Sequence, residues 1–177
     1  LTAPAQAQAL AELAVQRRGL KEAVVLYPET SYGTELKGAF GAEVEARGGT
    51  VVRTVGYEAD RTNFAPLVKE LVGRAQVEQR EDWREIQKAI VAEIQDPYRR
   101  ARALEKARKE LSPILPFDVI FVPDFARTIT LLAPALAAED VVIACDPAEV
   151  AKIQKVSAWV VKPILLLGAN GWDDPAI

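Results

Sequence analysis

A-V-V-L-Y-P-E-T-S-Y-G-T-E-L-K-G-A-F, residues Ala23–Phe40, is the stretch from which the rest of the predicted fold follows. Its first five residues form a short apolar run, which is typical of a strand buried on both faces of a parallel sheet. The chain then turns at Pro28, and Thr30 or Ser31 is placed to cap the free amides at the start of a helix. Because open α/β sheets bind ligands beyond the carboxyl ends of their strands, we expect Glu29–Gly33 to lie at a binding edge.

Three further segments carry a strand pattern, namely Thr50–Val55, Phe117–Val122 and Ile164–Leu167. Another segment, Val141–Ala144, fits either a short strand or a buried loop. Helical periodicity lies over Ala3–Arg18, before the first strand, and between the later strands. Since crossovers between parallel strands are right-handed, this order predicts an α/β fold whose parallel sheet has the strand order 2-1-3-4. With 177 residues, half of them hydrophobic, the chain can bury the core of one domain.

Residues 73–112 differ from the rest of the chain, because they are dense in charges of both signs and contain no strand pattern. Asp96 and Pro97 mark the end of one helix and the start of another. Each helix carries a narrow apolar stripe: Trp83, Ile86, Ile90 and Ile94 on the first, and Tyr98, Ala101, Leu104 and Leu111 on the second. We expect a helical hairpin inserted into the α/β domain. It is either a solvated appendage whose stripes pack on each other or a docking surface for another protein.

Composition excludes several classes of function. The chain contains no histidine, which removes histidine-based nucleophile pairs, general bases and zinc sites together. The net charge of −3 argues against an electrostatic grip on nucleic acid or on an anionic membrane. No apolar run reaches the ~18 residues that span a bilayer, and we expect no signal peptide within these residues. Because the chain begins with Leu1 rather than methionine, we expect it to be a piece of a longer protein.

Cys145 is the single cysteine, so the chain cannot form an internal disulfide and its cysteine usage does not fix the redox compartment. We interpret Cys145 as a small packed or capping residue. A reactive thiol would need nearby positive charge, whereas Asp146 and Glu149 supply the opposite.

Polar and aromatic residues follow three of the predicted strands and should meet at one edge of the sheet. They are Glu29, Thr30, Ser31 and Tyr32 after the first strand, Asp124 and Phe125 after the third, and Asn170 and Trp172 after the last. We predict that these residues bind a ligand. Each also has a structural alternative: Thr30, Ser31 and Asp124 are suitable helix caps, the acidic residues could be surface charges, and Phe125 and Trp172 could cover the end of the core.

Sequence motifs argue against an enzyme. The G-x-x-x-x-G-K-[ST] loop of phosphoryl transfer is absent, and the turn Pro28–Gly33 lacks the G-x-G-x-x-G of dinucleotide sites. A phospho-receiver would need a lysine after the last strand, where Asn170 and Trp172 stand instead. Glu29 and Asp124 are the one pair of carboxylates at this edge that could serve acid–base catalysis. We therefore expect no catalytic residue, no cofactor and no metal site.

Several segments resemble the type I periplasmic binding proteins, the extracellular ligand-binding receptors of branched-chain amino acid transport. They are V-V-L-Y-P-E-T-S-Y-G-T-E-L, F-G-A-E-V-E-A-R-G-G-T-V-V and T-N-F-A-P-L-V-K-E-L. The closing segments F-D-V-I-F-V-P-D-F and L-L-G-A-N-G-W-D-D-P are most similar to the penicillin-binding-protein activators. The resemblance covers about two-thirds of the chain and leaves out residues 73–112 and roughly 140–162.

This resemblance implies a fold of two flavodoxin-like lobes that close on a ligand through a hinge. Residues 1–177 would form one α/β lobe, the start of the second, and the first lobe of the same parent chain would be its partner. The resemblance also implies export to the periplasm, with a lipid anchor on the full-length protein. It implies a non-catalytic lobe that is adapted to a regulatory role or to binding an envelope protein. The alternative is the solute-binding component of an ABC transporter for amino acids or another small polar ligand.

The resemblance assigns roles to three residues at the predicted edge. Amino-acid-binding members offer an aromatic residue in the Y-G turn, an aromatic residue after the third strand, and an acid after the fourth strand for the ligand ammonium. Tyr32, Phe125 and Asn170 stand at these positions, so the rings are kept while the acid is replaced by a neutral amide. A hydrogen bond to a charged partner contributes roughly 1.5–3 kcal/mol, so ammonium binding should be weaker by about ten- to a hundredfold.

Overall fold

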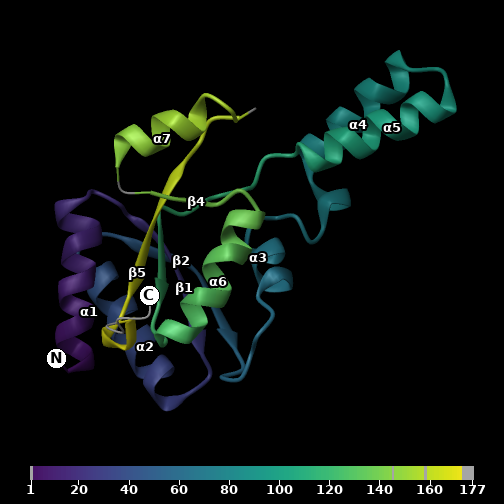
Figure 1. The fold of residues 1–177 in the computed structure, drawn as a ribbon. Coiled ribbons are helices and arrows are strands. Elements are labelled where there is room, and N and C mark those ends of the chain that lie inside the picture. Colours follow the sequence, from purple (N-terminus) through teal and green to yellow (C-terminus); the bar gives the residue numbers. More distant parts are fainter. Residues whose placement is uncertain (1, 145, 158, 173–177) are drawn as a thin grey trace.

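A computed structural model describes residues 2–144, 146–157 and 159–172 (Figure 1). The strands are β1 (Glu22–Pro28), β2 (Thr50–Tyr57), β3 (Val119–Val122), β4 (Val142–Ile143) and β5 (Pro163–Gly168). The α-helices are α1 (Ala3–Ala11), α2 (Ser31–Ala46), α3 (Ala65–Leu71), α4 (Glu81–Glu93), α5 (Pro97–Lys109), α6 (Ala126–Ala138) and α7 (Pro147–Gln154). Shorter turns are η1 (Glu12–Arg17), which continues α1 as a π-helix, and the 3₁₀ turns η2 (Val77–Gln79) and η3 (Asn170–Trp172). The prediction for Cys145 lies outside the described residues.

The described strands form one parallel sheet in the order β2-β1-β3-β5-β4. The predicted α/β class is therefore confirmed. The order differs from 2-1-3-4 because a fifth strand, β4, pairs with β5 at the edge of the sheet, where Val142 faces Pro163 and Ile143 faces Ile164. Two residues are too few to show a strand period, which is why the sequence left this segment open between strand and loop.

The central strand β1 is buried on both faces, as its apolar run predicts. Val24 and Leu26 belong to one hydrophobic cluster, with residues of α3 and α6, while Ala23 and Val25 belong to the other, with residues of α1 and α2. Successive side chains of a strand point to opposite faces, so the sheet lies between two helical layers (Figure 1). This three-layer arrangement aligns the carboxyl ends of β1, β3 and β5 at one edge.

The turn after β1 has a defined geometry. Thr30 caps α2, because its hydroxyl accepts a hydrogen bond of 3.1 Å from the backbone N–H of Gly33. A Cβ atom at Gly33 would lie 2.2 Å from the carbonyl oxygen of Pro28, so only glycine fits here. Of the two predicted capping residues, Thr30 is therefore the one used, and Ser31 is the exposed first residue of the helix.

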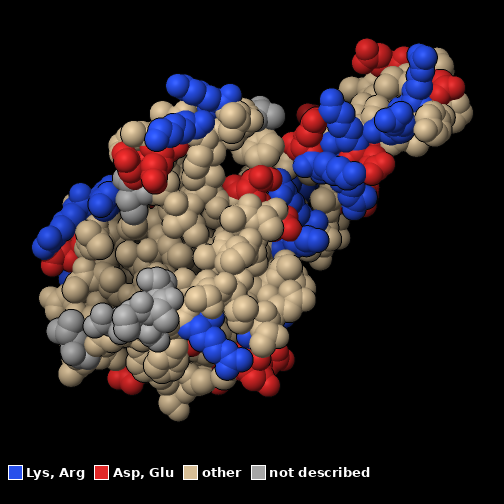
Figure 2. Space-filling view, viewed as in Figure 1, with Lys and Arg blue, Asp and Glu red and all other residues tan. Residues whose placement is uncertain are grey.

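Helices α4 and α5 pack on each other and project from the sheet domain (Figure 1). We call this pair of helices the hairpin. Residues 80–112 carry nine cationic and seven acidic side chains, and Figure 2 shows this mixture along the projection. A separate small cluster of Val77, Trp83 and Leu111 forms its core. Asp96 caps α5, as predicted, by accepting a hydrogen bond of 2.8 Å from the N–H of Arg99.

The second predicted apolar stripe is wrong in part. Tyr98 is 71% exposed, and the guanidinium of Arg102 lies over its ring, 6.0 Å from the centroid. Tyr98 stands in the first turn of α5, near the tip of the hairpin, whereas Leu104 and Ala107 face the small core farther along. The division into a single α/β lobe with an insertion at residues 73–112 stays a prediction.

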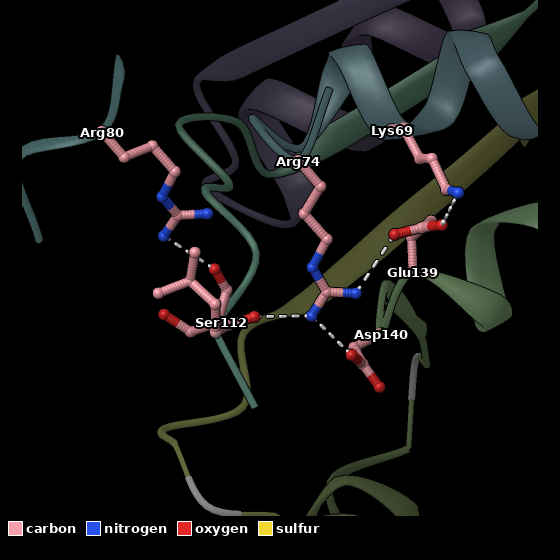
Figure 3. A network of polar contacts seen from close by, with 7 residues as sticks. Lys69, Arg74, Arg80, Ser112, Glu139 and Asp140 are labelled. Atoms are coloured by element: carbon pink, nitrogen blue, oxygen red, sulfur yellow. Dashed lines mark hydrogen bonds and ion pairs between the residues drawn. The ribbon is translucent and has the colours of Figure 1, made fainter. Parts of the chain in front are cut away.

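Arg74 ties the hairpin to the lobe, and Arg80 joins the two ends of the hairpin to each other (Figure 3). Arg74 donates to Glu139 at 3.2 Å, to Asp140 at 2.6 Å and to the carbonyl oxygen of Leu111 at 2.7 Å. Arg80 donates to the carbonyl oxygen of Ser112 at 2.9 Å and to both carboxylate oxygens of Asp82. The hydrogen bond from Arg80 holds the pKa of Asp82 below its usual value. These contacts join residues far apart in the sequence at the point where the chain leaves and re-enters the lobe.

Candidate functional site

The carboxyl ends of β1, β3 and β5 meet at the edge where α6 begins and η3 lies, which is the lower end of the molecule in Figure 1. The hairpin projects from the opposite end. Three loops converge at this edge, namely those that follow Pro28, Val122 and Gly168. The contacts described below join these loops, so the edge is one surface rather than three separate turns.

An aromatic pair forms the most exposed part of the edge. The rings of Tyr32 and Phe125 stack with their centroids 5.7 Å apart and their planes at 18°. Phe125 is 59% exposed, whereas Tyr32 is half-buried. Burial raises the pKa of Tyr32, a hydrogen bond with the backbone of Gly171 acts in the opposite direction, and the charge of Asp124 raises it further, with a net increase. Tyr32 therefore stays neutral, and the pair offers a flat apolar platform to whatever lies above it.

Asp124 holds the edge together from within. It is 6% exposed and accepts hydrogen bonds from the Tyr57 hydroxyl at 2.7 Å, the Thr128 hydroxyl at 2.8 Å and the backbone N–H of Phe125 at 2.7 Å. The sequence-based alternatives of a surface charge or a helix cap are both wrong, because Asp124 is buried and Phe125 occupies the capping position of α6 without a side-chain cap bond. With both oxygens engaged, Asp124 positions the Phe125 loop.

Tyr57 is the residue at this edge that the sequence-based prediction missed. It is 3% exposed, and burial together with its hydrogen bond to Asp124 strongly raises its pKa. Tyr57 ends β2, so the rule that led to the other three loops would have pointed to it as well. Glu58, Asp60, Arg61, Thr62 and Asn63 follow Tyr57 directly, so the signal was present in the sequence and the prediction left this loop out.

The loop that follows β5 contacts both α1 and the Phe125 loop. The backbone N–H of Asn170 donates a hydrogen bond of 2.9 Å to the side chain of Gln6 in α1. A Cβ atom at Gly171 would lie 2.8 Å from the carbonyl oxygen of Asp124 and 2.8 Å from Phe125 Cδ1, so the two loops touch through this glycine. The side chain of Asn170 is exposed beside them.

Trp172 lies against the core rather than on the open surface. Its ring covers Gly168, where a Cβ atom would come within 1.9 Å of Trp172 Cδ2, and it packs on the cluster that includes Val24 and Leu26. The indole N–H is buried and has no hydrogen-bond partner among the described residues. These contacts match the alternative in which Trp172 covers the end of the core.

The remaining predicted residues follow β1. Glu29 is exposed, its backbone N–H donates to the carbonyl oxygen of Tyr57 at 2.8 Å, and its carboxylate lies beside Gly56. Ser31 is exposed, whereas Thr30 is occupied as the cap of α2. Glu29, Ser31, Tyr32, Phe125 and Asn170 thus leave atoms open to solvent at the edge, while Thr30, Asp124 and Trp172 serve mainly to build it.

Neither a metal site nor a membrane span stands out in the described ranges. Within residues 2–144, 146–157 and 159–172, no group of three or more Cys, Asp and Glu side chains is arranged to hold a metal ion. No helix in this part of the chain is long and apolar enough to cross a bilayer.

A family profile described as periplasmic binding protein matches residues 2–76, which is less than half of the chain. This region contains β1, the Tyr32 turn and β2. A search of curated proteins gives no significant match. The matched segment therefore supports the resemblance for the first part of the chain.

Several solved structures of solute-binding proteins share this architecture. A solute-binding protein of an ABC transporter from R. palustris, in complex with 4-hydroxybenzoate, matches with 14% identity and a TM-score of 0.53 over 96% of this chain and 30% of that one. A leucine-binding protein from Thermotoga maritima matches with 16% identity and a TM-score of 0.51 over 98% of this chain and 32% of that one.

A substrate-binding periplasmic protein from Ralstonia solanacearum matches with 12% identity and a TM-score of 0.50, over 96% of this chain and 30% of that one. The chain thus spans about a third of the length of each of these three structures. At such low identity the likeness concerns the fold: the chain has the α/β fold of one lobe of a periplasmic binding protein.

Proposed function

We propose that this chain is the ligand-binding second lobe of a receptor of the periplasmic-binding-protein type, and that the first lobe of the same parent chain faces its carboxyl edge. The observation that carries the proposal is the Tyr32–Phe125 pair, because an aromatic ring that is 59% exposed at a strand end is suited to contact with a partner surface or ligand. The profile match over residues 2–76 and the shared lobe fold support it.

The ligand site would be half of a cleft. Tyr32 and Phe125 supply an apolar floor, and Glu29, Ser31 and Asn170 supply exposed polar groups around it. The arrangement suits a small ligand with a flat or aliphatic part and a polar rim, closed from above by the missing lobe. The role is binding rather than catalysis, in an exported protein that a lipid anchor holds at the periplasmic face of the envelope.

We propose further that the receptor has a regulatory role and contacts an envelope protein. Two features favour this role over plain amino acid uptake. Asn170 is neutral where amino-acid-binding members offer an acid, and the hairpin adds a charged projection at the end of the lobe away from the cleft (Figure 2). The similarity of the closing segments to penicillin-binding-protein activators points in the same direction.

The second candidate is the solute-binding component of an ABC transporter. It is favoured by the solved structures, one of which is a leucine-binding protein and another of which holds 4-hydroxybenzoate. A ligand such as 4-hydroxybenzoate has no ammonium group, so the neutral Asn170 would not weaken its binding. A stacked pair of rings could also accept a flat aromatic ligand.

Calorimetry on the longer parent chain, with both lobes, separates these roles. We expect leucine, isoleucine and valine to bind poorly to the unmodified parent and about ten- to a hundredfold more tightly to the Asn170→Glu variant, because the carboxylate would neutralise the ammonium. The isolated chain should show no measurable affinity, since half a cleft leaves the ligand hydrated. Micromolar binding of leucine or 4-hydroxybenzoate by the unmodified parent, lost in Phe125→Ala, would put the transport role ahead.

The non-catalytic part of the proposal has its own test. Hydrolase, kinase and oxidoreductase substrates should show no turnover above background. Turnover that is abolished by Glu29→Gln would contradict it. Glu29 is the suitable position because its side chain is exposed, so the substitution leaves the buried Asp124 contacts intact.

A further inference from the structure

A second hollow lies at the base of the hairpin, where η2 meets the end of α3 and the middle of β2. It has a volume of about 450 Å³, which falls in the range of small-molecule sites. Its walls come from Arg53, Glu70, Gly73, Ala75, Gln76, Gln79, Arg80 and Ile114. Since the hairpin projects from the end of the lobe opposite the Tyr32–Phe125 edge, this hollow is separate from the cleft proposed above (Figure 1).

Arg80 is the buried charge of the hollow. Its side chain is only 6% exposed, and its Nε and Nη2 atoms donate to Asp82. Nη2 also donates to the carbonyl oxygen of Ser112 (Figure 3). The third nitrogen, Nη1, is buried and has no hydrogen-bond partner among the described residues. A guanidinium donor that is removed from water without an acceptor is unfavourable. Because Nη1 is closed off from solvent, an acceptor in the hollow stabilises it through a shift of the Arg80 side chain toward the hollow.

Other donors surround the same space. Gln76 and Gln79 are exposed, and their side-chain amides make no hydrogen bond to a described residue. Arg53 pairs with the carboxylate of Glu70 and also reaches its carbonyl oxygen at 3.3 Å. Each guanidinium group already has a carboxylate partner, Glu70 for Arg53 and Asp82 for Arg80. The surplus at the hollow is therefore one of hydrogen-bond donors, because Nη1 of Arg80 and the two amides have no acceptor among the described residues. Such a surplus favours a ligand that is rich in acceptor oxygens, such as a carboxylate.

The remaining wall is apolar. Ala75 and Ile114 line it, and Ile114 is 44% exposed. A Cβ atom at Gly73 would lie 3.0 Å from Ile114 Cδ1, so the glycine lets this side chain lie close against the backbone. An inorganic oxyanion would leave this apolar wall unused, whereas an organic anion with a short hydrocarbon part would cover it.

We propose that the hollow between Arg53, Gln76, Gln79 and Arg80 binds a small organic carboxylate with a short hydrocarbon part. Arg53 and Gly73 belong to the lobe, while Gln76, Gln79 and Arg80 belong to the base of the hairpin. The bound carboxylate therefore bridges the lobe and the hairpin. Arg80 also donates a hydrogen bond to the carbonyl oxygen of Ser112, where the chain returns from the hairpin to the lobe. Ligand binding therefore stiffens the joint that orients the hairpin.

Calorimetry and thermal melting of this chain with disodium succinate test the proposal, with sodium phosphate and sodium chloride at matched ionic strength as parallel arms. We expect a saturable heat and a saturable rise in melting temperature with succinate, a weaker effect with phosphate and none with chloride. No saturable response to succinate up to about 10 mM, where even weak millimolar sites are filled, would overturn the proposal. Phosphate binding as tight as succinate binding would overturn the assignment to an organic carboxylate.

Variants locate the binding. Gln79→Ala and Arg53→Gln alter exposed or half-buried side chains of the hollow, and each should weaken succinate binding by about tenfold through the loss of one donor. Arg102→Gln, a cation of α5 outside the hollow, should leave it unchanged. Equal weakening by Arg102→Gln would reveal a diffuse charge effect and sink the proposal. Phe125→Ala, at the other end of the lobe, should not affect succinate binding, so the two proposed sites can fail separately.

Discussion

The two ends of this molecule are held together by different kinds of contact. At the carboxyl edge, a buried carboxylate accepts three hydrogen bonds from neutral groups, and two rings and two glycines close the remaining gaps. At the hairpin end, two arginines join carboxylates and backbone carbonyls across the joint (Figure 3). Side chains at the carboxyl edge leave an aromatic surface exposed. At the joint, where the hairpin meets the lobe, the charges of Arg74 and Arg80 are paired with carboxylates of the same chain.

The comparison indicates where stability and where function reside. Removing one member of a partly buried charge network leaves the others uncompensated, which costs more than losing a neutral hydrogen bond. The joint should therefore be more sensitive to single substitutions than the aromatic surface of the edge. Substitutions of exposed residues at the edge can therefore change the ligand that binds there without loss of the fold.

Arg74→Met should have the largest effect. The side chain of Arg74 is 14% exposed and that of Glu139 is 11% exposed. The substitution leaves Asp140 and the Leu111 carbonyl without this donor, and leaves the partly buried Glu139 with Lys69 alone, 4.0 Å away. We expect a loss of about 3–5 kcal/mol in the free energy of unfolding, measured by urea denaturation. Arg108→Met is the matched control, because its pair with Glu78 is more than half exposed on both sides and should contribute less than about 1 kcal/mol. Equal losses in the two variants would contradict the role of burial.

Asp124→Ala tests the interior of the carboxyl edge. The substitution leaves the hydroxyls of Tyr57 and Thr128 without their buried acceptor, and we expect a loss of about 2–3 kcal/mol in the free energy of unfolding. Glu29→Ala, at the exposed carboxylate of the same edge, should change stability by less than about 0.5 kcal/mol. If both variants unfold at the same denaturant concentration, Asp124 does not organise the edge.

Tyr57→Phe should cost about 1–1.5 kcal/mol at neutral pH, through one lost hydrogen bond to Asp124. The pKa of Tyr57 is raised in the folded state by burial and by that bond, so its contribution is complete below the ordinary tyrosine pKa of about 10 and falls as the pH rises above it. The limiting loss is about 1.4 kcal/mol per pH unit. The stability difference between the two proteins should therefore shrink above about pH 10, as followed by urea denaturation at several pH values. A constant difference across this range would show that Tyr57 ionises freely in the folded protein.

A double-mutant cycle on Tyr32→Ala and Phe125→Ala measures the aromatic pair itself. Stacked rings contribute about 0.5–1.5 kcal/mol beyond their buried area, and we expect a coupling energy in this range. Additive effects would mean that the rings lie side by side without stabilising each other. Because the cycle is measured without ligand, it shows whether the two rings already stabilise each other in the ligand-free protein.

The elements that the sequence predicted best are those set by local chemistry. The valine run of β1 and the Thr30 cap lie within a dozen residues of each other, and the Asp96 cap of α5 is equally local. Convergence of the three loops at one edge followed from strand topology alone. Such features need no knowledge of distant partners.

The features that escaped prediction depend on distant pairs. Asp124 and Tyr57 are 67 residues apart, and Arg74 and Asp140 are 66 residues apart. In a stretch dense in charges, Arg74 and Arg80 look like any other surface cation, and only the folded joint distinguishes them. Tyr98 was misassigned because its spacing fits an apolar stripe, whereas in the structure its side chain is exposed near the tip of the hairpin.

Deletion of the hairpin should have the smallest effect on the lobe. Removing residues 75–111 and joining the ends with a short glycine linker takes away the separate core of Val77, Trp83 and Leu111 but none of the two clusters that flank the sheet. Arg74 keeps Glu139 and Asp140 and loses only the Leu111 carbonyl, while the shorter connection lowers the entropy cost of closing the loop. These effects oppose each other, so we expect a cooperative transition and a change of less than about 0.5 kcal/mol in the free energy of unfolding. A molten product, with far-UV but no near-UV circular dichroism, would show that the hairpin belongs to the core and that the two ends of the molecule are not independent.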